Sequence, residues 1–317
     1  MSQSPKTEHT ASPHPYRAFA MRAGLGVALV AFLLWRYDAR PIFRILSRER
    51  EDCFAAAVAL YLGCQALSSY RWQLLAALLK VHGRYREFLA YYFVGMFTNL
   101  LVPGLVGGDA AKSVYLGRRH GRMGEAIASV VADRAVGLLG LFWLVALAAI
   151  FLHPASIPSW MIAAAIAAGV VTLAGLLLSP QIARLIHSMP RPLRRAGGIV
   201  APYLYNPAAL IPAIALSIVL QIGLAVGQYL LAVGLGMTVP LSLFIFCVPV
   251  ANVFASLPVT FNGLGIRESA YLLLFGMAGM RKEEAIALGL LWFAATMVGG
   301  LTGAIAFVST QAPIGEG

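Results

Sequence analysis

Long, mainly apolar runs constrain this chain more than any other feature. Such runs lie at 18–35, 53–79, 124–152, 160–179, 207–236 and 284–309. Each approaches or exceeds the ~20 residues that a helix needs to cross a bilayer. Because backbone polar groups in lipid must be paired within their own segment, these runs favour helices. Only 12% of the residues are charged, which is about half the share in a soluble domain. The sequence therefore predicts an all-α polytopic membrane protein with about six full spans.

The rest of the chain predicts one domain between two tails. Residues 1–16 are rich in Ser, Pro and His, and we expect a disordered N-terminal tail there. The transmembrane domain should extend over 17–310 and be followed by a short tail, 311–317. Between the first two runs, 36–52 interleaves five arginines and four acids with apolar residues such as Ile42 and Phe43. This pattern is typical of an amphipathic helix at the membrane interface.

The basic residues of the loops predict the orientation. The loop 180–206 carries four arginines, whereas 153–159 and 236–242 carry neither Lys nor Arg. Positive-inside logic places the first loop in the cytoplasm and the other two outside. Counting back along the chain, 80–87 and 118–123 are both cytoplasmic, and so is the N-terminus. The segment 88–117 should therefore enter and leave on one side, as a re-entrant hairpin.

Two polar, Pro- and Gly-containing stretches interrupt the apolar pattern at matching places in the two halves. Both begin with Asn, continue through Pro and a pair of glycines, and end in charges. The first runs from 99 to 121 and supplies Asn99, Pro103, Gly107, Gly108, Asp109 and Lys112. The second runs from 252 to 269 and supplies Asn252, Pro258, Asn262, Gly263, Gly265, Arg267 and Glu268.

These two stretches predict an inverted repeat. The second follows an external loop and so should enter from the side opposite to the first. A pair of broken elements in corresponding places is a pointer to a transporter-type binding site. Irregular backbone at membrane depth is tolerated only where protein buries it or where it lines a wet cavity. We expect the glycine N–H groups to face a ligand, and the helix starts to favour an anion. The alternative is two Pro/Gly kinks in tightly packed helices.

Charged residues within the spans are the other candidates for a site. Asp133 and Arg134 lie about ten residues into a span, roughly 15 Å deep. A charge there costs from ~3 kcal/mol upward unless it is paired or hydrated. Adjacent positions on a helix diverge, so each needs another partner. The candidates are Asp109, Lys112, Arg267 and Glu268. The group is either a site for a charged substrate or a structural ion-pair cluster.

Two further expectations concern single residues. Arg71 lies roughly 27 Å along its helix, so we expect it to reach the cytoplasmic interface as an anchor beside Trp72. The three cysteines, Cys53, Cys64 and Cys247, lie in or beside apolar runs and are interpreted as small apolar residues.

The sequence predicts no catalytic residue, metal site or cofactor. It contains no HExxH or CxxC motif and little soluble chain that could hold a catalytic triad. The net charge of +11 lies mainly in the loops. It therefore indicates orientation and anionic headgroups rather than nucleic acid.

Three motifs resemble a known family. They are "NLLVPGLVGGDAAKSVYLGRRHG", "VVADRAVGLLGL" and "NVFASLPVTFNGLGIRESAY". Together, and in this order, they are similar to the transmembrane domain of lysylphosphatidylglycerol synthases, the flippase-like UPF0104 family, which has stand-alone members. The resemblance extends over roughly 20–310. It implies lipid handling in a bacterial inner membrane and gives no support for aminoacyl transfer. Family members often carry arginine where this chain has Lys112, which leaves the headgroup open.

Two hypotheses for function follow. The first is a flippase-like protein that binds an anionic or phosphate-bearing lipid, such as a phospholipid or a polyprenyl- or hopanoid-type lipid, and moves it between leaflets. The second is an accessory membrane subunit that does not transport and that docks a lipid-modifying enzyme or glycosyltransferase. If the protein transports lipid, residues in the cavity between the hairpins should be essential for function. If it docks an enzyme, residues on the outer faces of the helices should be essential instead. The oligomeric state stays open.

Overall fold

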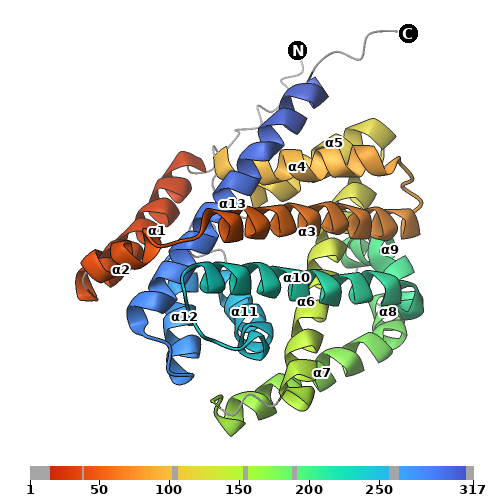
Figure 1. Ribbon diagram of the computed structural model, residues 1–317. Helices are drawn as coiled ribbons and strands as arrows, with labels where there is room; N and C mark the ends of the chain where they lie inside the picture. Colours follow the sequence, from red (N-terminus) through yellow and green to blue (C-terminus); the bar gives the residue numbers. More distant parts are fainter. Residues whose placement is uncertain are drawn as a thin grey trace, which may run out of the picture.

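The computed structural model describes residues 15–37, 39–101, 106–152, 156–187, 191–256 and 264–311. Every regular element within these ranges is helical, which confirms the predicted all-α class (Figure 1). In chain order the elements are α1 (Pro15–Arg36), α2 (Ala39–Leu46), α3 (Glu51–Leu78), α4 (Tyr85–Leu101), α5 (Val106–His120), α6 (Met123–Phe151), α7 (Ser159–Leu177), α8 (Ser179–His187), α9 (Arg191–Tyr205), η1 (Pro207–Leu210), α10 (Ile211–Gly234), α11 (Leu241–Ala255), α12 (Ile266–Met277) and α13 (Lys282–Gln311).

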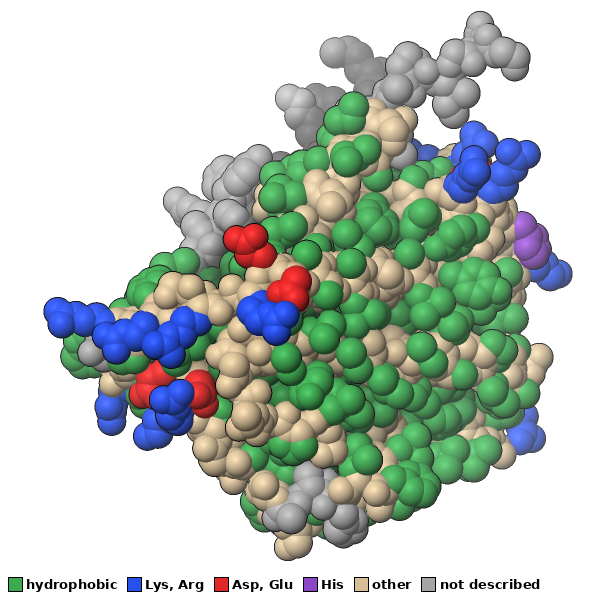
Figure 2. All heavy atoms as spheres, in the orientation of Figure 1, with side chains coloured by type: hydrophobic (Ala, Val, Ile, Leu, Met, Phe, Trp, Pro, Cys, Tyr) green, Lys and Arg blue, Asp and Glu red, His purple; other side chains and the backbone are tan. Residues whose placement is uncertain are grey.

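Five helices are long and apolar enough to cross a bilayer. These candidate spans are Glu51–Leu78, Met123–Phe151, Ser159–Leu177, Pro207–Gly234 and Lys282–Ser309. They match five of the six predicted spans. The sixth predicted span corresponds to α1. Within α1, only Val27–Arg36 is strongly apolar, and it is shorter than a candidate span. The number of six spans therefore stays a prediction. On the face drawn in Figure 2, charged side chains gather at the two ends of the molecule, and hydrophobic ones cover the surface between them.

The helix pair α4/α5 begins and ends at one end of the molecule. Glu87 at the start of α4 lies 3.5 Å from Arg119 at the end of α5. The side chain of Arg122, which follows α5, donates to the carbonyl of Lys80, at the end of α3, over 2.8 Å. Both flanks of this pair thus lie together, as the re-entrant interpretation requires. We call α4/α5 the first hairpin.

The pair α11/α12, the second hairpin, begins and ends at the opposite end. The end of α10, just before α11, meets the start of α3: a Cβ at Gly234 would lie 2.8 Å from the Cβ of Cys53. After α12, Arg281 lines a small hollow together with Arg44 of α2. Because α3 starts at this end and finishes at the other, the two hairpins enter the helical bundle from opposite ends.

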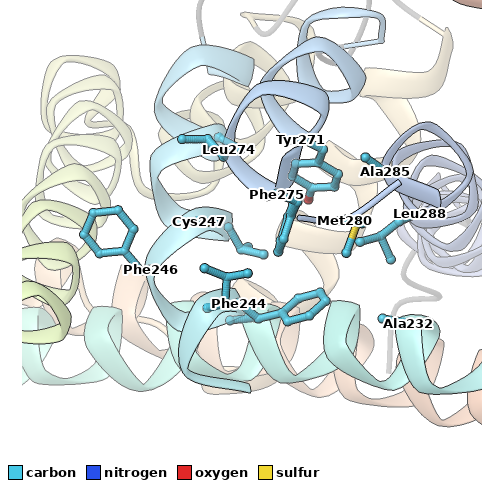
Figure 3. Close-up of a cluster of buried hydrophobic side chains, with 14 of the residues drawn as sticks. Ala232, Phe244, Phe246, Cys247, Tyr271, Leu274, Phe275, Met280, Ala285 and Leu288 are labelled. Atoms are coloured by element: carbon cyan, nitrogen blue, oxygen red, sulfur yellow. The ribbon is translucent and has the colours of Figure 1, made fainter. Parts of the chain in front are cut away.

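Aromatic packing holds the second hairpin in place. Phe244 and Cys247 of α11 face Tyr271 and Phe275 of α12 in a fully buried cluster that also includes Leu288 of α13 (Figure 3). The Phe244 and Phe275 rings lie 4.8 Å apart between centroids. All three cysteines are buried and free, which fits their interpretation as apolar residues.

The amphipathic segment is shorter than predicted and is partly packed on protein. Within 36–52 only α2 is helical before α3 begins. Ile42 is fully buried against Leu33, Ile286 and Ala287, whereas the Phe43 side chain is 58% exposed. The apolar face of α2 is therefore divided between contact with α13 and an exposed edge.

Candidate functional site

A polar cavity of about 440 Å³ lies where the two hairpins meet the long helices. The first hairpin supplies part of its wall and the second supplies another part, and α3, α6, α10 and α13 complete it. Its polar and charged lining residues are Tyr61, Gln65, Arg71, Tyr92, Asn99, Asp109, Lys112, Asp133, Arg134, Gln221, Asn252, Ser256, Arg267, Trp292 and Thr296. The cavity thus combines residues of both stretches that the sequence singled out.

Asp133 of α6 pairs with Arg71 of α3 inside the protein. The Arg71 Nε and Nη2 atoms lie 2.9 and 2.8 Å from Asp133 Oδ1, and Nη1 donates to the Ser217 hydroxyl over 2.8 Å. Arg71 is 7% exposed and Asp133 is 3% exposed. The expectation that Arg71 reaches the interface is therefore wrong. The prediction used only the depth of Arg71 along α3. It did not include the carboxylate of Asp133 on the facing helix α6, which pairs with the guanidinium.

Lys112 joins this pair to the first hairpin. Its Nζ lies 3.0 Å from Asp109 Oδ1 and 3.9 Å from Asp133 Oδ2. The same Nζ lies 4.6 Å from the ring centre of Tyr92 and 5.5 Å from that of Trp72. Aromatic faces attract a desolvated cation. The buried ammonium is thus held by two carboxylates and two rings.

Arg134 completes a chain of alternating charges. Its Nε bonds to Asp109 Oδ2, so the order is Arg71, Asp133, Lys112, Asp109, Arg134. The prediction that Asp133 and Arg134 take partners from a hairpin is confirmed for Lys112 and Asp109. Arg267 and Glu268, the other two candidates, form no ion pair with the described residues.

Gly108 brings the two helices of the first hairpin together. A Cβ at Gly108 would collide with the carbonyl oxygen of Gly95 and lie 2.6 Å from Asn99 Nδ2. The Gly108 N–H donates to Asn99 Oδ1 over 2.7 Å. The expectation that this N–H faces a ligand is therefore wrong, because Asn99 already satisfies it. Gly107 lies on α5 but outside the cavity wall.

Gly265 and Glu268 shape the start of α12. Gly265 has φ of +83°, in the left-handed region that favours glycine. Its N–H donates to Glu268 Oε2 over 2.5 Å, which satisfies one of the free donors at a helix start. Glu268 is fully buried and does not line the cavity. It is a capping residue rather than a partner for Asp133 or Arg134.

Arg267 is the least satisfied charge at the site. It is 8% exposed and lines the cavity. Its Nε and Nη1 atoms are buried without a hydrogen-bond partner among the described residues. Four bases and two acids line the cavity, so the lining carries a surplus of two positive charges. Glu268, next to Arg267 in the chain, lowers this surplus to one.

Some predicted site residues lie outside the described part of the chain, and some lining residues were not predicted. Pro103, Pro258, Asn262 and Gly263 lie outside the described residues. The polar lining residues that the sequence analysis did not name are all uncharged: Tyr61, Gln65, Tyr92, Gln221, Ser256, Trp292 and Thr296. The signal that could have found the glutamines is an amide side chain within an otherwise apolar span, since such groups need a partner in lipid.

Comparisons with known proteins agree with the motif resemblance. The family described as the lysylphosphatidylglycerol synthase TM region matches residues 19–303. UPF0104 membrane protein PH1989 of Pyrococcus horikoshii is 25% identical over 118 residues, which cover 36% of this chain and 35% of that protein. No solved structure matches the chain.

Proposed function

Because the chain belongs to the family of the lysylphosphatidylglycerol synthase TM region, we propose that it binds an anionic, phosphate-bearing lipid and moves it between leaflets. The proposal places it in a bacterial inner membrane with its N-terminus in the cytoplasm. It assigns lipid movement to the chain and no chemical reaction.

Arg267 carries this proposal. Two of its buried nitrogens have no hydrogen-bond partner among the described residues, and a buried guanidinium in that state costs free energy unless an anion approaches it. The other three bases of the cavity already have carboxylates: Arg71, Lys112 and Arg134 all contact Asp133 or Asp109. A planar guanidinium suits phosphate oxygens, which accept its N–H groups. A lipid phosphate in the cavity would satisfy Arg267 and offset the positive surplus.

The position of the cavity supports movement in addition to binding. Its wall is built from hairpins that enter from opposite ends, an arrangement that places a site at the interface of two repeats. Such repeats can open the site to each side in turn by rocking against each other. The acyl chains could stay in lipid during this motion while the headgroup occupies the polar cavity.

The test is translocation of acyl-labelled phospholipids in proteoliposomes. We expect the wild type to move an anionic lipid faster than empty liposomes do, and faster than it moves a zwitterionic one. Arg267→Gln should lower this rate roughly tenfold or more, as loss of hydrogen bonds from a charged group implies. The matched control is Arg119→Gln, because that side chain is 53% exposed and lies outside the cavity; its rate should be unchanged.

One result would overturn the proposal. If the wild type moves no anionic lipid above empty liposomes, with the candidate lipids and ion gradients supplied, lipid movement is not its function. The accessory-subunit hypothesis then takes its place, and variants on the outer faces become the next test.

A further inference from the structure

The proposed function does not account for the five arginines of 36–52. They lie at the end of the molecule where the second hairpin enters, and Figure 2 shows Lys and Arg side chains gathered there, beside α1 and α2. The loop charges predict that this end is external, a side on which the positive-inside rule expects few bases. A local role for these side chains would explain their presence.

Three arginines from two distant segments of the chain line one hollow at this end. The hollow has a volume of about 310 Å³. Arg44 and Arg48 come from α2 and the turn after it, and Arg281 comes from the loop between α12 and α13. Glu283 also lines the hollow, so the lining carries a surplus of two positive charges. Two apolar residues complete the wall: Pro41 and Ile45.

Two of these arginines have no carboxylate partner in the part of the chain that the structure describes. Arg281 Nε lies 2.8 Å from Glu284 Oε1, but neither Arg44 nor Arg48 forms an ion pair there. Glu49, next to Arg48 in the chain, turns its carboxylate towards Gly234 and buries both oxygens. An anion in the hollow would therefore meet guanidinium groups that no carboxylate neutralises.

Core packing holds the two arginine-bearing segments together. Ile42 on α2 is fully buried in one cluster with Ile286 of α13. Arg44 lies on the same short helix as Ile42, and Arg281 immediately precedes α13. A guanidinium is a planar fork that matches phosphate oxygens, so three of them around one hollow favour a phosphate group as the ligand.

The surroundings of the hollow are typical of the boundary between membrane and water. Trp35 near the end of α1 is 80% exposed, and Phe43 on α2 is 58% exposed. The ring centre of Tyr37 lies 5.4 Å from Arg36 Cζ and 5.4 Å from Lys282 Nζ. Aromatic and basic side chains gather in this way at the depth of the headgroups. A lipid phosphate can therefore reach the hollow while its acyl chains stay in the bilayer.

We propose that this hollow is a second anionic lipid site, in which Arg44, Arg48 and Arg281 bind the phosphate of a lipid from the leaflet at the α2 end. The site is separate from the cavity between the hairpins and does not rest on the proposed function. Because its arginines are exposed, the lipid exchanges freely with the bilayer and is lost when the protein is extracted. While bound, the phosphate ties α2 and the start of α13 to the headgroup layer.

The test is a lipid titration followed by native mass spectrometry, which resolves each bound lipid. Purified protein in mild detergent is mixed with dioctanoyl phosphatidic acid, and Arg44→Gln/Arg48→Gln is compared with the wild type. Each base near a membrane surface contributes about fivefold to affinity, so the double variant should bind the exchangeable lipid roughly tenfold more weakly or worse. Because both side chains are exposed, its unfolding midpoint should match that of the wild type.

The matched control is Arg84→Gln/Arg86→Gln, which removes two exposed arginines at the opposite end of the molecule. Its affinity for phosphatidic acid should equal that of the wild type. Dioctanoyl phosphatidylcholine, which has no net charge, should bind the wild type and Arg44→Gln/Arg48→Gln equally. Inorganic phosphate should bind far more weakly than phosphatidic acid, because it brings no acyl chains to the apolar surroundings.

Three results would overturn the proposal. Unchanged binding of phosphatidic acid by Arg44→Gln/Arg48→Gln would exclude the hollow as its site. Equal weakening in the two double variants would show that binding follows net charge alone. Inorganic phosphate that binds as tightly as phosphatidic acid would exclude a lipid as the ligand.

The same titration of Arg267→Gln separates this site from the proposed function. Exchangeable binding that persists in Arg267→Gln and is lost in Arg44→Gln/Arg48→Gln supports the hollow. If Arg267→Gln abolishes all binding, the hollow is not a lipid site, whereas the cavity between the hairpins keeps its support. If binding depends on Arg44 and Arg48 but not at all on Arg267, the hollow stands and the proposed function fails.

Discussion

At the scale of residues, the charges that line the cavity have two separate roles. Arg71, Asp133, Lys112, Asp109 and Arg134 satisfy one another across α3, α5 and α6. Arg267, in contrast, has two nitrogens without a partner among the described residues. The chain of charges therefore joins the first hairpin to α3 and α6, and we propose that Arg267 is the charge that binds a ligand. On this proposal, the two hypotheses raised by the sequence, a structural cluster and a substrate site, apply to neighbouring parts of one cavity.

Asp133→Asn should destabilise the protein by about 3–5 kcal/mol, because it leaves the buried Arg71 without its carboxylate. Adding Arg71→Gln should recover part of this loss by removing the stranded charge. The measurement is unfolding in detergent. The control is Asp52→Asn in the exposed pair with Arg50, whose side chains are 62% and 66% exposed; its unfolding midpoint should change far less than that of Asp133→Asn. A single Asp133 variant as stable as the wild type would contradict the ion-pair account.

Glu49, in the loop between α2 and α3, predicts a dependence of stability on pH. Burial, and secondarily the charge of Asp52, raises the pKa of Glu49 to about 7 from its ordinary 4.5. The folded state therefore holds a proton that the unfolded state releases, so stability is full below pH 4.5 and falls as pH rises towards 7. Glu49→Gln should raise the unfolding midpoint at pH 8 and leave it nearly unchanged at pH 4. An equal shift at both values would refute this assignment.

At the scale of elements, the first hairpin depends on close contact between α4 and α5. Gly108→Ala would place a Cβ against the backbone of Gly95 and against Asn99. Because backbone cannot move aside cheaply, we expect a lower unfolding midpoint and weaker lipid binding. Gly63→Ala is the control, since a Cβ there meets nothing within 4 Å; it should be neutral or slightly stabilising. If the two variants have the same unfolding midpoint and the same lipid binding, the close contact between α4 and α5 is not needed for stability or binding.

The sequence predicted the hairpins better than it predicted their contacts. Pro, Gly and charge within apolar runs are local signals, so the sequence predicted the two breaks and named Lys112 and Asp109 among the partners of Asp133 and Arg134. The pairing of Arg71 with Asp133 was not, because it joins positions 62 apart and depends on how α3 packs on α6. The amide of Gln221 carries no charge and so gave no signal in a count of intramembrane charges. The sequence pointed to Gly108 as a ligand-binding residue. In the structure its N–H donates to Asn99, and its lack of a side chain allows α4 and α5 to pack closely.

At the scale of the whole molecule, the two ends should face opposite sides of the membrane. The loop around Ser156 is predicted to be external and the one around Arg84 cytoplasmic, and both side chains are exposed. Single cysteines introduced by Ser156→Cys and Arg84→Cys should react with an impermeant reagent from opposite sides of oriented cells. The buried native cysteines should react slowly from either side. Labelling of both positions from one side would refute the inverted insertion of the hairpins.

We propose that the cavity between the hairpins holds one lipid headgroup. Both hairpins and four of the long helices contribute to its wall, so occupancy reports on the complete arrangement. A lipid held by Arg267 should survive gentle detergent extraction, because a buried charge pair dissociates slowly when water is excluded.

The most direct test is native mass spectrometry of the protein extracted in mild detergent, with identification of any lipid that remains bound. We expect the wild type to retain one phosphate-bearing lipid, and Arg267→Gln to lose it while Arg119→Gln keeps it. A wild type that carries no phosphate-bearing lipid, or an Arg267→Gln protein that retains the same lipid as the wild type, would contradict the assignment of the cavity as an anionic headgroup site.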